Sequence, residues 1–275
     1  MKKCIACLMA VSMLLAIAGC KKDEQYENPF TPPSGTSSDE APADTSEEEP
    51  AESESETEPA VNVDVMNYSA YIDADMDAEV TIEAYVQAKQ SWWEDKATVY
   101  LQDEDGAYFC YNMTCSEEDY DKLVDGQKIR VTGFKSEWSG EVEIVDATFE
   151  IIDGNWLATP VDVTEELGTE DLIDKQNQLV SFTGMTVEAS KDADGNDVAF
   201  LYKWDGSGSE GDDLYFNVSV NGETYTFTVE SYLCDKDSDV YKAVTGLSIG
   251  DTIDMEGFLY WYEGVNPHIT KVTVK

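Results

Sequence analysis

The sequence predicts an all-β chain with short helices, in which one small barrel domain occurs twice. The first observation is a motif that is repeated with identical spacing, Leu-x-x-Gly-x-x-Ile-x-x-x-Gly-Phe. The second is the alternation of apolar and polar residues that is typical of strands with one buried face. The third is a set of turn signals between those segments. The two copies of the motif are Leu123, Gly126, Ile129, Gly133 and Phe134, and Leu247, Gly250, Ile253, Gly257 and Phe258.

Each residue type in the motif has a structural reason. The first glycine, Gly126 or Gly250, lets the backbone reverse in a turn. The isoleucine begins a row of inward-facing side chains. The second glycine, Gly133 or Gly257, removes a side chain where a curled strand must bend sharply. This combination is typical of a small barrel and carries no catalytic chemistry.

The first repeat is predicted to contain three strands, a short helix and two more strands. Its first strand alternates apolar residues, from Val80 to Val86, with polar or aromatic ones. Asp105-Gly106 indicates a hairpin turn, and Ser116 to Asp119 forms a capping box that begins a helix ending at Leu123. The predicted strands are 80–87, 97–102, 107–113, 128–134 and 141–151, with a loop at 135–140 between the last two.

The second repeat is predicted to begin near Leu179. It contains a strong hairpin signal, Asn221-Gly222, between strands 214–220 and 223–229. Compared with the first repeat, it inserts a hairpin at 189–213 between its first two strands. It also lengthens the helical connection at 231–247.

The order of three strands, a helix and two strands resembles the OB-fold, a five-stranded Greek-key barrel with a helix between strands three and four. The likeness covers both repeats. We therefore expect two tandem five-stranded OB-like barrels, at residues 61–152 and 165–275, joined by a linker at 153–164. Residues 165–178 are expected to lead into the second barrel as residues 67–79 lead into the first.

The first twenty residues predict export. Lys2 and Lys3 precede an uncharged run that is too short to span a bilayer but suits a signal peptide, here residues 1–19. The run ends in Leu-Ala-Ile-Ala-Gly before Cys20, which resembles the lipobox of bacterial lipoproteins. This resemblance implies that Cys20 carries a diacylglyceryl thioether and an added acyl group such as palmitate. It also implies an extracytoplasmic location at the bacterial cell surface, anchored in the membrane. An ordinary secretory signal is the alternative.

Residues 20–60 are predicted to be a disordered acidic linker. Of the 58 acidic residues of the chain, 13 lie between positions 21 and 60, with only Lys21 and Lys22 as basic residues. The remaining residues are mostly Pro, Ser, Thr, Ala and Gly, so the segment cannot bury enough apolar surface to fold. We interpret it as a tether; an acidic recruitment tail is the alternative.

The charge of the remaining chain bears on its partners. Residues 61–275 contain 45 acidic and 13 basic residues, a net charge of −32. Nucleic-acid-binding proteins usually present a basic surface to the phosphate backbone. We therefore do not expect nucleic acid as a partner, and a glycan or a peptide is the favoured ligand.

Six aromatic residues are the candidate ligand-binding residues. OB-folds commonly bind ligands across strands two and three and through the loops that join strands one to two and four to five. Exposed rings in such loops can stack on sugars, bases or side chains. The alternative is that they close the barrel ends or cover the junction between the barrels. The candidates are Trp92, Trp93 and Trp138 in the first repeat and Tyr260, Trp261 and Tyr262 in the second.

The remaining acidic residues and the single histidine do not indicate a metal or catalytic site. Asp192, Asp194 and Asn196 alternate as in the beginning of a calcium loop, but no glutamate follows at the spacing of an EF-hand. Asp-Gly-Asn is also ordinary turn chemistry. The single histidine, His268, precedes the last strand without a nucleophile motif, and we expect it to be structural. No metal or cofactor is expected.

Three cysteines remain after the signal peptide and Cys20, namely Cys110, Cys115 and Cys234. They cannot all pair within the chain, and they lack the Cys-x-x-Cys spacing of a zinc site. Buried thiols are expected, with a disulfide between Cys110 and Cys115 left open.

Taken together, these features predict a lipid-anchored, extracytoplasmic binding or accessory module with two OB-like barrels. The chain resembles small surface lipoproteins with OB-type repeats. We do not expect an enzyme, because no motif carries a reaction. The two alternatives are a metal-dependent secreted hydrolase or nuclease accessory domain, and a structural spacer in which the aromatic residues serve only packing.

Overall fold

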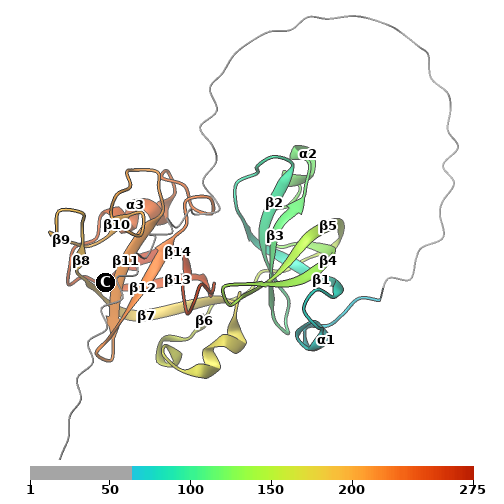
Figure 1. Cartoon of the computed structure of the whole chain (residues 1–275), viewed down its shortest axis with the longest axis horizontal. Helices are drawn as coiled ribbons and strands as arrows, with labels where there is room; N and C mark the ends of the chain where they lie inside the picture. Colours follow the sequence, from blue (N-terminus) through green and yellow to red (C-terminus); the bar gives the residue numbers. More distant parts are fainter. Residues whose placement is uncertain (1–63) are drawn as a thin grey trace, which may run out of the picture. The chain divides into compact units, whose positions relative to one another are not determined.

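The structure is a computed structural model, and it describes residues 64–275. The signal peptide, Cys20 and the acidic tether predicted from the sequence lie outside the described residues. Among the helices of residues 64–275, none is long and apolar enough to cross a membrane. The expected fold class is confirmed, because this part of the chain is mostly strand and forms two closed five-stranded barrels (Figure 1).

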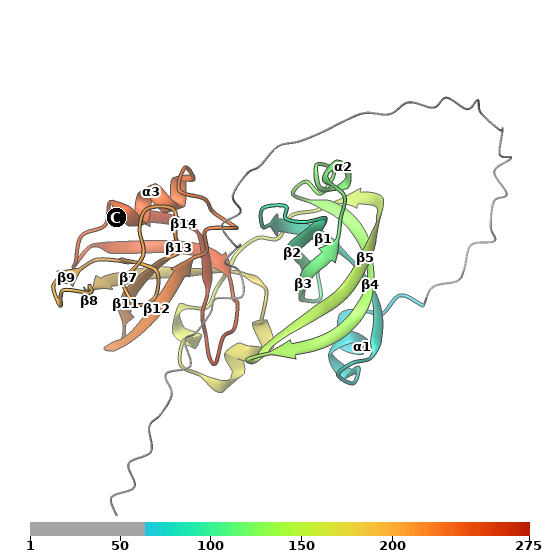
Figure 2. The ribbon, with the colours of Figure 1, turned by 45° about the horizontal axis from the view of Figure 1, so that its top comes forward.

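The first barrel has the strand order β1-β2-β3-β5-β4 and closes by pairing of β4 with β1. Neighbouring strands are antiparallel except β3 and β5, which pair in parallel at Cys110 and Ile144. Figure 2 shows the curled strands with α1 and α2 at opposite ends of the barrel. The elements are α1 (Tyr68–Asp73), β1 (Glu79–Lys89), β2 (Lys96–Gln102), β3 (Ala107–Thr114), α2 (Glu117–Tyr120), β4 (Gln127–Trp138) and β5 (Glu141–Asn155).

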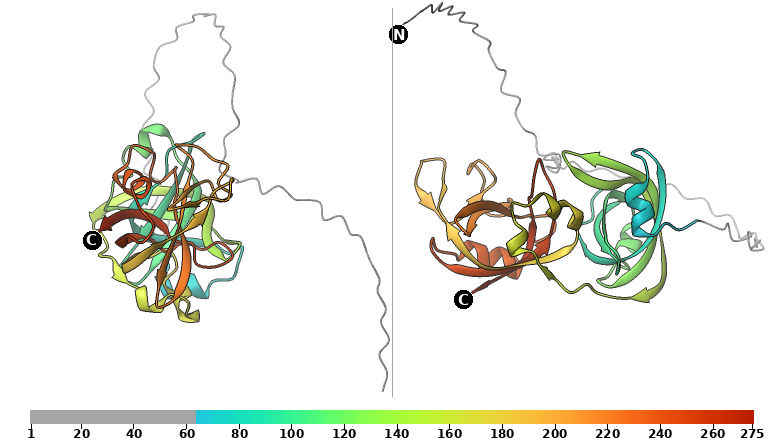
Figure 3. Two further views of the ribbon diagram at one scale, coloured as in Figure 1. Left: turned by 90° about the vertical axis from the view of Figure 1, so that its left-hand side faces the viewer. Right: turned by 90° about the horizontal axis from the view of Figure 1, so that it is seen from below.

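The second barrel repeats this order, with β11-β12-β14-β13-β7 closed by pairing of β11 with β7. Figure 3 shows its closed sheet from two further sides. Its main elements are β7 (Leu179–Glu188), β11 (Leu214–Val220), β12 (Glu223–Val229), α3 (Asp239–Thr245), β13 (Thr252–Phe258) and β14 (His268–Val274). The additions are β6 (Val161–Asp162), η1 (Thr164–Glu166), η2 (Glu170–Lys175), β8 (Ser190–Lys191), β9 (Asp197–Val198) and β10 (Leu201–Tyr202).

The core of each barrel follows from the alternation in its strands. In β1, Val80, Ile82, Ala84 and Val86 are all at most 1% exposed and belong to one apolar cluster. In β11, Leu214, Phe216 and Val218 point into the second core in the same way. Alternate residues of a strand face opposite sides, so every second residue is left for the outer surface of the barrel.

The second glycine of the motif lies where two strands approach too closely for a side chain. A Cβ atom on Gly257 would lie 2.3 Å from the carbonyl oxygen of His268, and one on Gly133 would lie 2.8 Å from the Cβ of Ala147. The strand register also shifts at both glycines. The predicted sharp bend is therefore confirmed in both repeats.

The predicted loop at 135–140 is wrong. Strand β4 continues to Trp138, and β5 begins at Glu141, so only Ser139 and Gly140 form the turn. Both have positive φ, 54° and 94°, as a two-residue type I′ hairpin requires. The pairing of β4 with β5 extends to Trp138 and Glu141, so Trp138 ends a strand and does not lie in a loop.

The predicted helix after β3 is shorter than expected. Ser116 caps it as predicted, since its hydroxyl accepts a hydrogen bond from the backbone N–H of Asp119 at 3.1 Å. The helix ends at Tyr120, because Lys122 and Leu123 bond to carbonyls three residues back in tighter turns. This places Leu123 fully inside the first core.

The side chain of Lys135, in strand β4, caps the C-terminal end of helix α1. Its side chain is 4% exposed, and its ammonium donates hydrogen bonds to the carbonyl oxygens of Tyr71, Ile72 and Ala74 at 2.7 to 3.0 Å. The last carbonyls of a helix lack partners within the helix and favour a positive charge. Lys135 therefore fixes α1 against strand β4 and holds the Tyr71 ring in the first core.

Candidate ligand-binding faces of the two barrels

The outer face of β2 and β3 in the first barrel is buried. This is the surface that OB-folds commonly use for ligands. Tyr100 and Phe109 pair directly across the two strands, and both point outward, yet they are at most 1% exposed. Gln102, also on this face, is 8% exposed.

The second barrel covers this face. The Tyr100 ring stacks on Phe258 at 4.3 Å between ring centroids, and the Phe109 ring meets Tyr260 edge to face at 5.4 Å. The Tyr100 hydroxyl shares a 2.8 Å hydrogen bond with Nδ1 of His268, whose ring stacks on Tyr260 at 4.3 Å. We call the cluster of Tyr100, Phe109, Phe258 and Tyr260 the junction cluster.

Polar contacts surround the junction cluster. The side-chain oxygen of Gln102 accepts a hydrogen bond from the backbone N–H of Leu179 at 2.9 Å, and the Glu141 carboxyl accepts one from the N–H of Trp261 at 2.9 Å. The N–H of Ser91 donates to the carbonyl of Tyr232 at 2.8 Å. The outer face of β2 and β3 is therefore filled by the second barrel and is not open to a ligand.

The matching face of the second barrel is different in chemistry and exposure. Residues Tyr215, Asn217 and Ser219 of β11 point outward, opposite Thr228, Thr226 and Thr224 of β12. Thr224 and Thr226 are exposed, Tyr215, Asn217 and Ser219 are half-buried, and Thr228 is buried. We call these six residues the β11–β12 face. None of them carries a charge.

The insertion between β7 and β11 borders the β11–β12 face. Strand β10 pairs with β11, which places Leu201 opposite Tyr215. Trp204 follows this strand and is 51% exposed. The side chain of Asn217 bonds to the carbonyl of Ala189 at 3.3 Å and accepts a hydrogen bond from the Thr226 hydroxyl at 2.7 Å. The insertion thus extends the β11–β12 face by one short strand, β10, and places the exposed Trp204 beside it.

The six aromatic residues predicted as ligand contacts differ in exposure and in the residues that they contact. Trp93 is 49% exposed, while the indole N–H of Trp92 donates to the carbonyl of Cys115 at 2.9 Å. Tyr260 is 5% exposed in the junction cluster. Trp138 and Tyr262 contact each other at 5.1 Å between ring centroids, and Trp261 lies against Gly140. Ligand binding by these residues stays a prediction.

The calcium candidate is a turn. The Asp192 carboxylate accepts hydrogen bonds from the N–H groups of Asp194 and Asn196 at 3.0 and 2.7 Å, and from the Asn196 side chain at 3.0 Å. These bonds lower the pKa of Asp192. Throughout residues 64–275, no group of three or more His, Cys, Asp or Glu side chains could hold a metal ion.

The thiols of Cys110, Cys115 and Cys234 are free. Burial raises the pKa of Cys115 to about 11 and that of Cys234 to about 12, which makes both poor nucleophiles at neutral pH. Burial also lowers the pKa of His268 to about 3, so its ring is neutral.

Three buried carboxyl groups lie near the junction. Burial raises the pKa of Glu141 well above its usual range, that of Glu143 to about 7 and that of Glu230 to about 8. Glu230 accepts hydrogen bonds from the N–H groups of Tyr232 and Leu233 at 3.1 and 2.9 Å. It thereby holds the segment whose Tyr232 carbonyl contacts Ser91 of the first barrel.

No family model matches the chain, and no curated protein matches it. Among solved structures, it is similar to the p204 HINb domain, with 10% identity, a TM-score of 0.33, and coverage of 74% of this chain and 100% of that one. It is also similar to the Ifi202 HINa domain in complex with 20bp dsDNA, with 11% identity, a TM-score of 0.32, and coverage of 72% and 98%. A replication protein A heterotrimer bound to ssDNA matches with 12% identity, a TM-score of 0.26, and coverage of 70% and 49%.

These structures contradict two expectations from the sequence. A glycan or peptide was favoured over nucleic acid as the ligand, and nucleic acid was not expected as a partner, whereas two of these neighbours hold DNA. The expectation used the total charge of residues 61–275, whereas the β11–β12 face itself carries no charged residue. The likeness itself is one of fold, and no binding residue is carried over to this chain.

Proposed function

We propose that this chain is a binding module whose ligand lies across the β11–β12 face of the second barrel. OB-folds commonly use this face, and the matching face of the first barrel is covered by the junction cluster. The β11–β12 face also carries hydroxyl and amide groups that can donate and accept hydrogen bonds. The uncharged, partly exposed sheet is the observation that carries the proposal.

The ligand class that we propose is single-stranded nucleic acid, bound through its bases. Tyr215 on the face and Trp204 beside it offer rings for stacking, which tolerates any base sequence. Asn217 and Thr226 can bond the edges of bases. Because residues 61–275 carry a net charge of −32, the phosphates are expected to point toward solvent.

A binding titration at several salt concentrations tests this proposal. We expect the full chain to bind a fluorescently labelled oligothymidylate, with an affinity that is unchanged or increases as salt rises, because salt screens the repulsion between the acidic protein and the phosphates. Proteins that bind through phosphates show the opposite trend. The change Tyr215→Ala should weaken binding by about 1–3 kcal/mol, the range for one stacked base.

Trp93→Ala is the control, since Trp93 is aromatic and 49% exposed but lies outside the β11–β12 face. It should leave the affinity unchanged. An affinity that depends on Trp93 and not on Tyr215 would move the site to the first barrel. Binding of an oligosaccharide or peptide without any binding of the oligonucleotide would refute the ligand class.

Catalysis is not part of the proposed function. The only histidine of the chain is 7% exposed and bonded to Tyr100, so no substrate reaches it. The bound oligonucleotide should therefore be recovered at full length after prolonged incubation with and without Mg²⁺. Shortened products that depend on the added metal would restore the hydrolase alternative.

We also propose that a lipid on Cys20 anchors this module at a bacterial cell surface. The support is the sequence from Leu15 to Cys20, with a branched residue, small residues and then the cysteine. Two or three acyl chains hold a protein firmly at a membrane. The change Cys20→Ala should move the protein from the membrane fraction to the soluble fraction. Intact mass of the native protein without acyl groups would rule the anchor out.

A further inference from the structure

The carboxyl group of Glu141 lies at the junction of the two barrels and is out of contact with solvent. Glu141 begins β5 of the first barrel and is 0% exposed. Its oxygen Oε2 accepts a hydrogen bond from the backbone N–H of Trp261, in the second barrel, at 2.9 Å. Its other oxygen, Oε1, is buried and has no partner among the described residues. An ionised carboxylate is strongly destabilised in such a place, whereas a protonated carboxyl needs only an acceptor for its proton.

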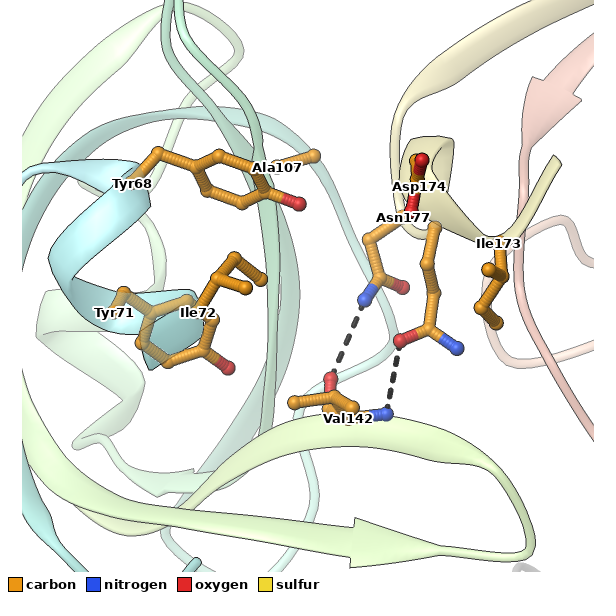
Figure 4. Close-up of a pocket in the computed structure, with 9 residues that line it drawn as sticks. Tyr68, Tyr71, Ile72, Ala107, Val142, Ile173, Asp174 and Asn177 are labelled. Atoms are coloured by element: carbon orange, nitrogen blue, oxygen red, sulfur yellow. Dashed lines mark hydrogen bonds between the residues drawn. The ribbon is translucent and has the colours of Figure 1, made fainter. Parts of the chain in front are cut away.

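The side chain of Asn177 supplies an acceptor. It interacts with the Glu141 carboxyl, and the residue is 3% exposed. Its nitrogen Nδ2 donates to the carbonyl of Val142 at 3.4 Å (Figure 4). Its oxygen Oδ1 is the second buried acceptor of this contact that has no donor. One proton on Oε1 of Glu141 turns the first of these acceptors into a donor, and the second can receive it.

This contact joins the two barrels. Asn177 directly precedes the second barrel, and its backbone N–H donates to the carbonyl of Leu259 at 2.9 Å. The neighbouring Gln176 accepts from the N–H of Val142 at 3.1 Å (Figure 4) and donates to the carbonyl of Gly140 at 2.8 Å. The turn between β4 and β5 of the first barrel is thus held by the second barrel on both sides of Glu141. The protonation state of this carboxyl therefore affects the packing of one barrel on the other.

The ionisable groups that interact with Glu141 do not balance a negative charge. Glu143, on the same face of β5, raises the pKa of Glu141 further beyond the effect of burial. Tyr71 of α1 and Tyr100 of β2 also interact with Glu141, and burial raises the pKa of both hydroxyls, so they stay neutral. The ring of His268, bonded to Tyr100 from the second barrel, is neutral because burial lowers its pKa to about 3.

The lysines on the elements around Glu141 are bonded elsewhere. Lys135 of β4 donates to the last carbonyls of α1, and Lys175 of η2 pairs with Glu166. Glu230, the third buried carboxyl near the junction, interacts with Tyr100 from the second barrel. The carboxylates of the adjoining turns are on exposed residues, namely Glu137, Asp174 and Glu263.

From these contacts we propose that the two barrels are held together by a proton-dependent contact at Glu141. The protonated carboxyl bonds to Asn177 and Trp261 and keeps the second barrel on the outer face of β2 and β3. Loss of the proton leaves a buried charge that only water can stabilise, so the junction separates. Tyr100 and Phe109 of the junction cluster then become accessible. This device does not depend on the ligand proposed for the β11–β12 face.

The direction of the pH effect follows from burial. Burial raises the pKa of Glu141 in the closed junction well above its ordinary value of 4.5. Relative to an open junction, in which the carboxyl is in water, the stabilisation is complete below pH 4.5. It decreases as pH rises and is lost above the pKa of the closed junction. The junction is therefore closed in acid and opens in alkali.

The first measurement is the protonation state of Glu141 in the full chain. A carbon-13 NMR titration of the glutamate carboxyl groups follows it, and the Glu141 signal is identified by its absence in Glu141→Gln. We expect this signal to titrate well above pH 4.5. A signal that titrates at an ordinary pKa, or that does not titrate before the chain unfolds, would overturn the proposal.

The second measurement is calorimetry of the full chain about one pH unit below and above the measured pKa. Barrels that are held together should unfold in one transition, whereas separated barrels should unfold in two. The parent chain should therefore change from one transition to two as pH rises. Glu141→Gln should keep one transition at both pH values, because the amide has a donor and an acceptor but no proton to lose.

Glu143→Gln is the matched control, since it removes a buried carboxyl from the same face of β5 and leaves Glu141 in place. It should change from one transition to two, as the parent does. Two transitions in Glu141→Gln at the higher pH would contradict the proposal. A parent chain that keeps a single transition at both pH values would also contradict it, because Glu141 would then not control the contact between the barrels.

Discussion

Strands β2 and β3 of the first barrel and strands β11 and β12 of the second occupy the same place in one repeated fold, yet their outer faces differ completely. The first face carries Tyr100 and Phe109 and is buried in the junction cluster. The second carries Asn217 and Thr226 and stays partly exposed. The same topology thus provides an internal contact in one copy and a free surface in the other.

The difference shows that the OB topology supplies a surface and the outward residues decide its use. Aromatic residues on both sides of the junction remove apolar area from water, which stabilises the packing of the two barrels. Hydroxyl and amide groups gain little from such burial, and the face that carries them stays partly exposed.

The largest expected effect is on stability. Phe109→Ala should lower the free energy of unfolding by about 3–5 kcal/mol, the usual cost of truncating a buried aromatic residue. Tyr215→Ala, at the outer face of the other barrel, should cost about 1 kcal/mol or less. Urea unfolding of the full chain measures both. Equal losses for the two variants would mean that the β11–β12 face is packed and not open.

The second effect is a pH dependence that arises near the junction. Burial raises the folded-state pKa of Glu230 to about 8, from an ordinary value of 4.5. The folded state therefore holds this proton more tightly than the unfolded state, and stability falls as pH rises between these values. Glu143, with a pKa of about 7, acts in the same direction. From pH 6.5 to 8, Glu230 should account for a loss of about 2 kcal/mol.

Glu230→Gln should flatten this slope, while Glu223→Gln should leave it unchanged, because Glu223 is exposed at the end of the β11–β12 face. The window above pH 6.5 avoids His268, whose lowered pKa reduces stability only as pH falls below 6.5. Urea midpoints at pH 6.5 and 8 provide the measurement. A slope as steep in Glu230→Gln as in the parent chain would remove this residue as a cause, since Glu143 alone accounts for only part of it.

The smallest expected effect comes from adding one charge to the β11–β12 face. Thr226→Lys should strengthen binding of the oligothymidylate at low salt by about 1 kcal/mol, and Thr226→Glu should weaken it by a similar amount. Both should change stability by about 0.5 kcal/mol or less, as is usual for exposed positions. Fluorescence anisotropy at low salt compares them. Identical affinities would show that the oligonucleotide does not lie near Thr226.

Much of the fold could be predicted from local patterns. The alternation from Val80 to Val86 and the Asn221-Gly222 turn gave strands and a hairpin that the structure confirms. The Ser139-Gly140 turn was missed, because serine is a weaker signal for positive φ than asparagine, and the strands were then ended too early. Both glycine bends were predicted, since only a residue without Cβ fits there.

The candidate face could not be predicted in the same way. The sequence predicts Trp138 and Tyr260 as ligand contacts in loops, whereas the structure places them at or near the junction. The sequence does contain a signal for burial of the first face. Residues 97–101 are apolar at almost every position, as in a strand covered on both sides, whereas apolar and polar residues alternate over much of 214–220. The sequence does not show which segment covers this strand. Tyr100 and Phe258 stack on each other, but more than 150 residues separate them in the chain.

Hydrogen exchange of the full chain with and without the oligothymidylate tests the central claim most directly. If the second barrel binds the ligand, peptides covering residues 214–228 should gain protection when the oligonucleotide is added. Peptides covering residues 96–114 should be protected already and should not change, because the junction cluster covers them in both states. Protection that appears at residues 90–114 and not at 214–228 would contradict the account.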